Sequence, residues 1–76
     1  MKTTKSQAVL YLYACLLEKG SVEKSEIMDA LELSDLTFKR YVSELRSYLM
    51  NFSRPEELVY LKKENRYVLR PIRIDF

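Results

Sequence analysis

Hydroxyl and cationic side chains recur along residues 34–46 at positions that a helix would place on one side. Lysine and arginine can donate hydrogen bonds to phosphate oxygens, and an arginine can also donate two hydrogen bonds to a guanine. The members of this set are Ser34, Thr37, Lys39, Arg40, Ser43 and Arg46. Their chemistry indicates a surface that binds an anionic partner.

The residue types that catalysis needs are missing or isolated. The chain has no histidine and only one glycine, so it offers neither a base for Cys15 nor a glycine-rich phosphate loop. Its carboxylates are scattered singly among lysines and arginines. We therefore expect a protein that is not an enzyme and has neither a metal nor a cofactor. Cys15, the only cysteine, is predicted to be a buried thiol in a reducing compartment.

The apolar spacing predicts one helix over about residues 35–50. Phe38, Val42, Leu45 and Leu49 fall at i, i+4, i+7 and i+11, so they share one face. Ser34 stands where an N-cap belongs. The basic and hydroxyl side chains then lie away from the apolar stripe.

A shorter helix is predicted over about residues 24–31, with Ile27 and Leu31 on its buried side. The turn that follows lacks a glycine. If Glu32 takes a positive φ there, it does so at a cost of roughly 1 kcal/mol relative to glycine, which counts against the motif described next. A short helix, a tight turn and a longer helix with a basic leading face are typical of a helix-turn-helix, whose second helix enters the DNA major groove.

The first helix is predicted over about residues 5–19. Thr4 with Gln7 forms a capping box, and Gly20 takes the left-handed position after the helix. The expected core stripe consists of Val9, Leu12, Tyr13 and Leu16. Further apolar side chains at positions 10, 11 and 17 leave a spare face, which would cover a dimer interface, the C-terminal tail or a domain outside this chain. The apolar run of ten residues is too short to cross a bilayer, so we expect no membrane segment.

Residues 58–70 read as a β-hairpin, the wing, in which Asn65 accepts the left-handed turn position. Its tip is basic, with Lys62, Lys63 and Arg66. Val22 is expected to be a short extended residue between the first two helices. The tail, residues 71–76, would add an edge strand or lead into a following domain.

Positive charge is concentrated in the second half of the chain. Residues 1–34 hold four lysines against five acids, whereas residues 36–70 hold eight basic residues against four acids. A phosphate-contacting surface would need this distribution, although solvated faces of a small domain would show it too. At 76 residues the chain has room for one small domain.

Two short motifs resemble a known family. The segment LSDLTFKRYVSEL is similar to the recognition helix of bacterial regulators of the deoxyribose-repressor type and of those whose DNA-binding domain precedes a WYL domain. The segment Arg66-Tyr67-Val68-Leu69 is similar to the wing motif G-Y-x-L of that family. The matching positions of the helix are Leu33, Ser34, Thr37, Phe38, Arg40, Val42 and Leu45. The positions that depart from the family pattern are Glu32, Leu36, Tyr41 and Arg66.

Each contact in the expected interface has an alternative. Arg40, the leading contact, could instead pair with Glu44 one turn along the helix. Thr37 could touch a thymine methyl group or help to cap the helix. The basic hairpin tip could simply be solvated.

The resemblance and the residue pattern together predict a mainly α domain with a small β-hairpin, a three-helix winged helix-turn-helix spanning residues 1–76. We expect it to be a cytoplasmic bacterial transcription regulator that binds double-stranded DNA at specific sequences. We expect it to act as a dimer or as part of a larger assembly with a further C-terminal domain. The alternative is a winged helix used for protein-protein contact, favoured by Asp35, Leu36 and Tyr41, which make the surface less cationic.

Overall fold

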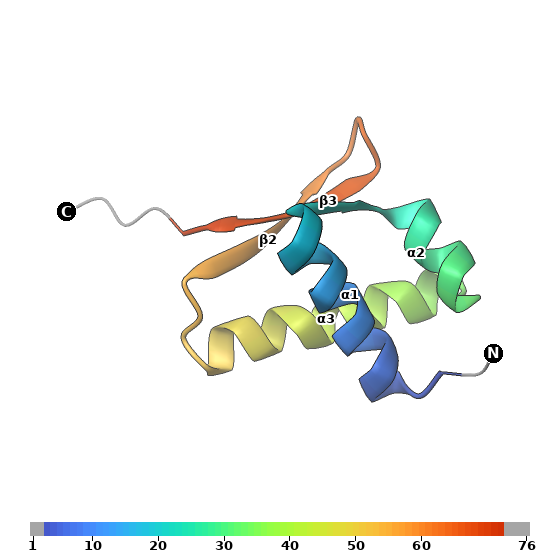
Figure 1. Ribbon diagram of the computed structural model, residues 1–76, viewed down its shortest axis with the longest axis horizontal. Coiled ribbons are helices and arrows are strands. Elements are labelled where there is room, and N and C mark those ends of the chain that lie inside the picture. Colours follow the sequence, from blue (N-terminus) through green and yellow to red (C-terminus); the bar gives the residue numbers. More distant parts are fainter. Residues whose placement is uncertain (1–2, 73–76) are drawn as a thin grey trace.

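Three helices and a three-stranded antiparallel sheet make up residues 3–72, the part of the chain that the computed structural model describes (Figure 1). In chain order, the elements are α1 (Lys5–Lys19), β1 (Ser21–Glu23), α2 (Lys24–Leu31), α3 (Asp35–Asn51), β2 (Glu56–Leu61) and β3 (Arg66–Pro71). The predicted helix boundaries therefore agree with the structure to within a residue. The hairpin is slightly longer than predicted at both ends.

Local side-chain and backbone chemistry sets the helix ends. The N–H of Gln7 donates to Oγ1 of Thr4 at 3.1 Å, and the Gln7 side chain accepts from the N–H of Thr4 at 3.2 Å, which confirms the capping box. Gly20 ends α1 at φ 79°, and Glu32 ends α2 at φ 53°. The left-handed φ of 50° at Asn65 likewise confirms the predicted turn residue. These predictions succeeded because each depends on residues a few positions apart.

The sheet has the strand order β1-β3-β2, with β3 in the centre. Val22 of β1 lies opposite Tyr67, and Leu58 of β2 lies opposite Leu69. The prediction of a single extended residue at Val22 was therefore incomplete, because residues 21–23 form a strand. Its partner lies more than 40 residues away, and the alternation within three residues is too short to reveal the pairing.

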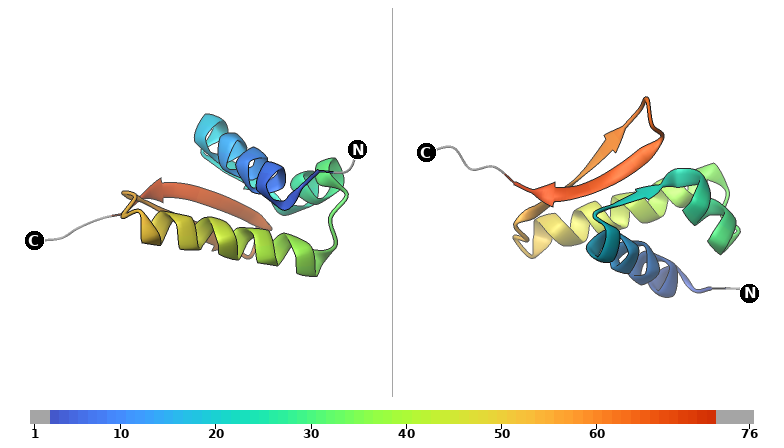
Figure 2. Two further views of the ribbon diagram at one scale, coloured as in Figure 1. Left: turned by 90° about the horizontal axis from the view of Figure 1, so that it is seen from below. Right: turned by 45° about the horizontal axis from the view of Figure 1, so that its top comes forward.

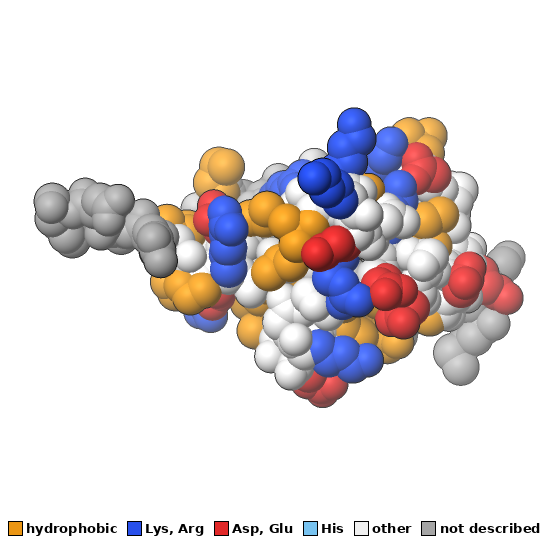
Figure 3. Space-filling model, turned by 90° about the horizontal axis from the view of Figure 1, so that it is seen from above, with side chains coloured by type: hydrophobic (Ala, Val, Ile, Leu, Met, Phe, Trp, Pro, Cys, Tyr) orange, Lys and Arg blue, Asp and Glu red, His pale blue; other side chains and the backbone are white. Residues whose placement is uncertain are grey.

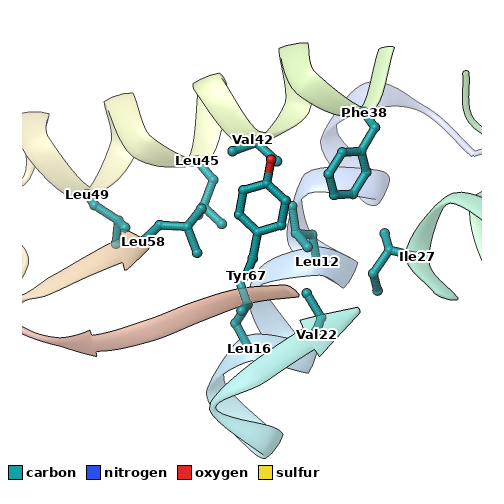
Figure 4. Close-up of a cluster of buried hydrophobic side chains, with 10 residues drawn as sticks. All are labelled: Leu12, Leu16, Val22, Ile27, Phe38, Val42, Leu45, Leu49, Leu58 and Tyr67. Carbon is teal, nitrogen blue, oxygen red and sulfur yellow. The ribbon is translucent and has the colours of Figure 1, made fainter. Parts of the chain in front are cut away.

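The core lies where α1 and α3 pack against the sheet (Figure 4). Phe38 is completely buried and its ring centre lies 5.5 Å from that of Tyr67. The ten residues of this cluster are Leu12, Leu16, Val22, Ile27, Phe38, Val42, Leu45, Leu49, Leu58 and Tyr67. The stripe predicted for α3 is confirmed in full.

The stripe predicted for α1 needs a correction. Ala8, Leu12 and Leu16 are its buried residues, whereas Val9 and Tyr13 are half-buried. Cys15 is also half-buried, so the expectation of a buried thiol was wrong. Val9 and Tyr13 line an open groove between α1 and α3, which crosses α1 at an angle (Figure 2, left), whereas Cys15 lines a separate pocket with Ser21 and Ile27.

The order of elements and the sheet topology give a three-helix winged helix, in which α2 and α3 form the helix-turn-helix and β2 and β3 form the wing. Most of the tail that was predicted to form an edge strand, residues 73–76, lies outside the described residues. Within residues 3–72, no helix is long and apolar enough to cross a membrane.

Candidate nucleic-acid interface

The outward ridge of α3 is the part of this helix that points directly away from the core. Side chains advance about 100° per residue around a helix, so the positions opposite the buried stripe are Leu36, Arg40, Ser47 and Asn51, and Ser43 and Glu44 flank them on either side. All six residues are exposed. Viewed from below, α3 lies in front of the sheet and no other element covers it (Figure 2, left). The ridge is therefore open to a large partner.

Arg40 is the only cation on the outward ridge. Its side chain forms no hydrogen bond or ion pair with any of residues 3–72. The alternative pairing with Glu44 is not present, because the Glu44 carboxylate accepts from Nζ of Lys5 at 2.9 Å. The guanidinium of Arg40 is thus free to bind an external anion or a base without first losing an internal contact.

Ser34 and Thr37 are engaged in the N-cap of α3. The Ser34 Oγ accepts from the N–H of Thr37 at 3.2 Å, and the two hydroxyl groups are hydrogen-bonded at 2.9 Å. Thr37 is half-buried. Of the two roles considered for Thr37, the structure shows the capping role.

Two lysines surround the single acid at the front of α3. Asp35 pairs with Lys24, the first residue of α2, and its second oxygen lies 3.1 Å from Nζ of Lys39. These hydrogen bonds, the one from Lys24 first, hold the pKa of Asp35 below its ordinary value, and the same contact raises the pKa of Lys24. Two cations therefore contact one carboxylate at the front of the helix.

The side chains of Arg46 and Arg66 form hydrogen bonds with strands of the sheet. The guanidinium of Arg46 donates to the carbonyl oxygen of Leu58 at 3.4 Å. Arg66 donates to the hydroxyl of Ser21 and to the carboxylate of Glu23, both at 2.9 Å, so its side chain is directed along β1 and not into the hairpin turn. The sequence could not indicate the position of the Arg66 side chain, because it depends on the pairing of β1 with β3.

The hairpin turn presents Lys62 and Lys63, whose side chains are exposed and form no hydrogen bond or ion pair with any described residue. The hydroxyl of Tyr60 donates to Oδ1 of Asn65 at 2.7 Å, and the N–H of Lys24 donates to the Asn65 carbonyl at 3.1 Å. These bonds connect the turn to the start of α2. The turn projects away from α3 (Figures 1 and 2), so the two would meet different parts of a long partner.

Charge on the hairpin side of the molecule is mixed. Viewed from above, Lys and Arg side chains alternate with Asp and Glu side chains and with apolar patches (Figure 3). No group of three or more metal-binding side chains occurs within the described part of the chain. On this side of the molecule the positive charge is therefore carried by individual cations among acidic and apolar side chains.

The structure divides the predicted site residues into two groups. Those whose side chains form no hydrogen bond or ion pair with another described residue are Arg40, Ser43, Lys62 and Lys63. Those with such a bond are Ser34, Thr37, Lys39, Arg46 and Arg66. Sequence reasoning missed Lys24 and did not include Leu36 or Ser47 among the contacts. Helix geometry alone could have identified the last two, whereas only the folded chain brings Lys24 to α3.

Comparisons with known proteins found no matching family model, no matching curated protein and no matching solved structure.

Proposed function

We propose that this chain binds double-stranded DNA as the winged helix-turn-helix domain of a bacterial transcription regulator in the cytoplasm. The observation that carries the proposal is the free guanidinium of Arg40 on the uncovered ridge of α3. In a helix-turn-helix, this is the helix that enters the major groove.

The residues around Arg40 suit close approach to base edges. Ser43 and Ser47 are short, so the helix axis can lie near the floor of the groove. Leu36, whose side chain is 61% exposed, offers an apolar contact for a thymine methyl group. Arg40 itself can donate two hydrogen bonds to O6 and N7 of guanine. The ridge thus combines one strong base contact with small side chains beside it.

Phosphate contacts would come from the lysines on either side of the ridge. Lys39 lies at the front of α3, and Lys62 and Lys63 lie on the wing, where they would reach the backbone of an adjacent groove. Such contacts hold the protein in register and make affinity fall with salt. A domain with so few free cations binds weakly alone, so we expect two copies on half-sites one helical turn apart.

Selection of bound sequences from a random duplex pool tests the proposal. We expect enrichment of a short motif that contains guanine, repeated as two half-sites. The matched control is the Arg40→Ala variant, which should lose the preference at the guanine position. A pool that shows no enrichment with the wild-type chain at low salt would contradict sequence-specific binding.

The second candidate is a protein-protein contact module with the same fold. It is favoured by the large apolar side chains that remain exposed at the C-terminal end of α3, where Met50 is 79% and Phe52 is 70% exposed. Binding of a mixed-sequence duplex at low salt separates the two candidates, because the contact module would not bind it.

A further inference from the structure

Lys24, the first residue of α2, contacts two parts of the proposed interface at once. Its backbone N–H donates to the carbonyl oxygen of Asn65 in the hairpin turn at 3.1 Å. Its side chain pairs with the carboxylate of Asp35 at the start of α3. Lys24 therefore joins the wing to the helix that carries Arg40.

The backbone bond takes the place of a missing helix cap. The first N–H groups of a helix have no partner within the helix, and the side chain of the N-cap residue usually satisfies one of them. Glu23, the N-cap residue of α2, forms no such bond, and the Asn65 carbonyl accepts from α2 instead. Asn65 is itself held in place, because the Tyr60 hydroxyl donates to its side chain at 2.7 Å. The start of α2 and the hairpin turn thus fix each other.

The side chain of Lys24 is largely covered. Only 16% of it is exposed, and its Nζ lies 6.0 Å from the centre of the Phe38 ring. Tyr67 of β3 packs against the same ring and reaches toward α3 (Figure 4), and its own ring centre lies 4.8 Å from that of Tyr60 on β2. A lysine in this position is held by Asp35 and is not free to contact a phosphate.

We propose that Lys24 is a positioning residue, which sets the wing relative to α3 so that Lys62 and Lys63 meet the DNA backbone while Arg40 lies in the major groove. Lys24 itself does not touch DNA. The wing lysines belong to the hairpin turn that the Lys24–Asn65 bond holds, and a hydrogen bond to phosphate is lost when its partners move apart by about 1 Å. This role rests on the proposed DNA-binding function.

The salt dependence of DNA binding measures whether the wing is in place. Each contact between a lysine and a phosphate contributes about one to the slope of log affinity against log salt. Replacing both Lys62 and Lys63 with alanine should therefore lower the slope by about two in the wild-type background. In the Lys24→Met background, where the side chain keeps its length but loses its charge, the same double replacement should lower the slope by less than about one. Fluorescence anisotropy with a mixed-sequence duplex gives the affinities.

Three further variants separate positioning from charge. Asp35→Ala breaks the same pair at an exposed residue and removes a negative charge, whereas Lys24→Met removes a positive one. Both should abolish the contribution of the wing lysines to the slope, although they change the net charge in opposite directions. Lys24→Arg keeps the pair and should retain this contribution. The matched control is Lys19→Met at the exposed end of α1, which removes the same charge as Lys24→Met and should also retain it.

Amide hydrogen exchange, followed by NMR, tests the joint without DNA. The N–H of residue 24 should exchange at least about tenfold faster in Lys24→Met than in the wild type, because loss of the pair with Asp35 loosens the bond to Asn65. The rate is taken relative to that of the N–H of Val42 in α3, which corrects for a change in global stability. Circular dichroism establishes first that each variant is folded.

The outcomes distinguish the positioning role from DNA binding itself. A wing contribution to the slope that is as large in Lys24→Met and Asp35→Ala as in the wild type would overturn the positioning role and leave DNA binding in place. An unchanged exchange rate at residue 24, or wing lysines that do not alter the wild-type slope, would overturn it too. A wild-type chain that binds no duplex at low salt would overturn the proposed function and the positioning role together.

Discussion

Replacing Arg40 with alanine should weaken DNA binding more than replacing any other arginine of the domain. Its guanidinium has no bond to another described residue, so no internal contact offsets what it gains from DNA. A bidentate contact to guanine contributes about 1–3 kcal/mol, which corresponds to a loss of roughly 5- to 150-fold in affinity. Fluorescence anisotropy with a labelled duplex taken from the selected pool gives the dissociation constants.

The salt dependence shows which kind of contact is lost. If Arg40 reads a base, Arg40→Ala lowers the affinity while the slope of log affinity against log salt is unchanged. If it contacts phosphate, the slope falls by about one. Arg40→Lys separates the two cases again, because lysine keeps the charge but cannot form the planar pair of hydrogen bonds.

The matched control is Arg70→Ala. Arg70 is exposed on β3 and is paired with Glu57 at 3.0 Å, on the sheet and not on the recognition helix. We expect this variant to bind nearly as the wild type does. If the Arg40 variant bound as tightly as the control at all salt concentrations, the assignment of the outward ridge would be refuted.

Three further predictions concern the fold and the front of α3. Phe38→Ala should lower the free energy of unfolding by about 3–5 kcal/mol, because Phe38 is fully buried. The control Leu36→Ala, at an exposed position, should change it by less than about 0.5 kcal/mol. Urea titration measures both values. Gly20→Ala should cost roughly 1 kcal/mol in the same assay, from backbone strain at φ 79° alone, since nothing lies within 4 Å of the added Cβ. A variant as stable as the wild type would contradict the left-handed conformation of residue 20. Because the pKa of Asp35 is lowered, its contribution to stability is present above the ordinary carboxyl value of 3.8 and is lost as the pH falls below that value. Asp35→Asn should remove this part of the pH dependence of the free energy of unfolding. A variant with the same pH dependence as the wild type would show that the pairs with Lys24 and Lys39 do not form.

Features that depend on neighbouring residues could be predicted from the sequence. The Thr4 capping box, the Ser34 N-cap and the left-handed residues Gly20 and Asn65 all follow from interactions within a few positions. The apolar period of α3 was long enough to identify every buried position. The winged-helix arrangement followed from these elements in order.

Features that depend on distant residues could not be predicted. Strand β1 exists only because β3 supplies its partner, and that pairing directs Arg66 toward Ser21 and Glu23. The side chain of Lys24 pairs with Asp35 of α3, and the backbone N–H of Lys24 donates to the carbonyl oxygen of Asn65 in the hairpin turn. A single sequence contains no period or motif for such contacts, so the choice among similar cations on α3 and the wing had to come from the structure.

The most direct test of DNA binding is an equilibrium titration of the wild-type domain with a mixed-sequence duplex at low and at high salt. Binding through Arg40, Lys39 and the wing lysines predicts measurable affinity at low salt and a linear fall of log affinity with log salt. An absence of binding at low salt, or an affinity that does not change with salt, would contradict the account.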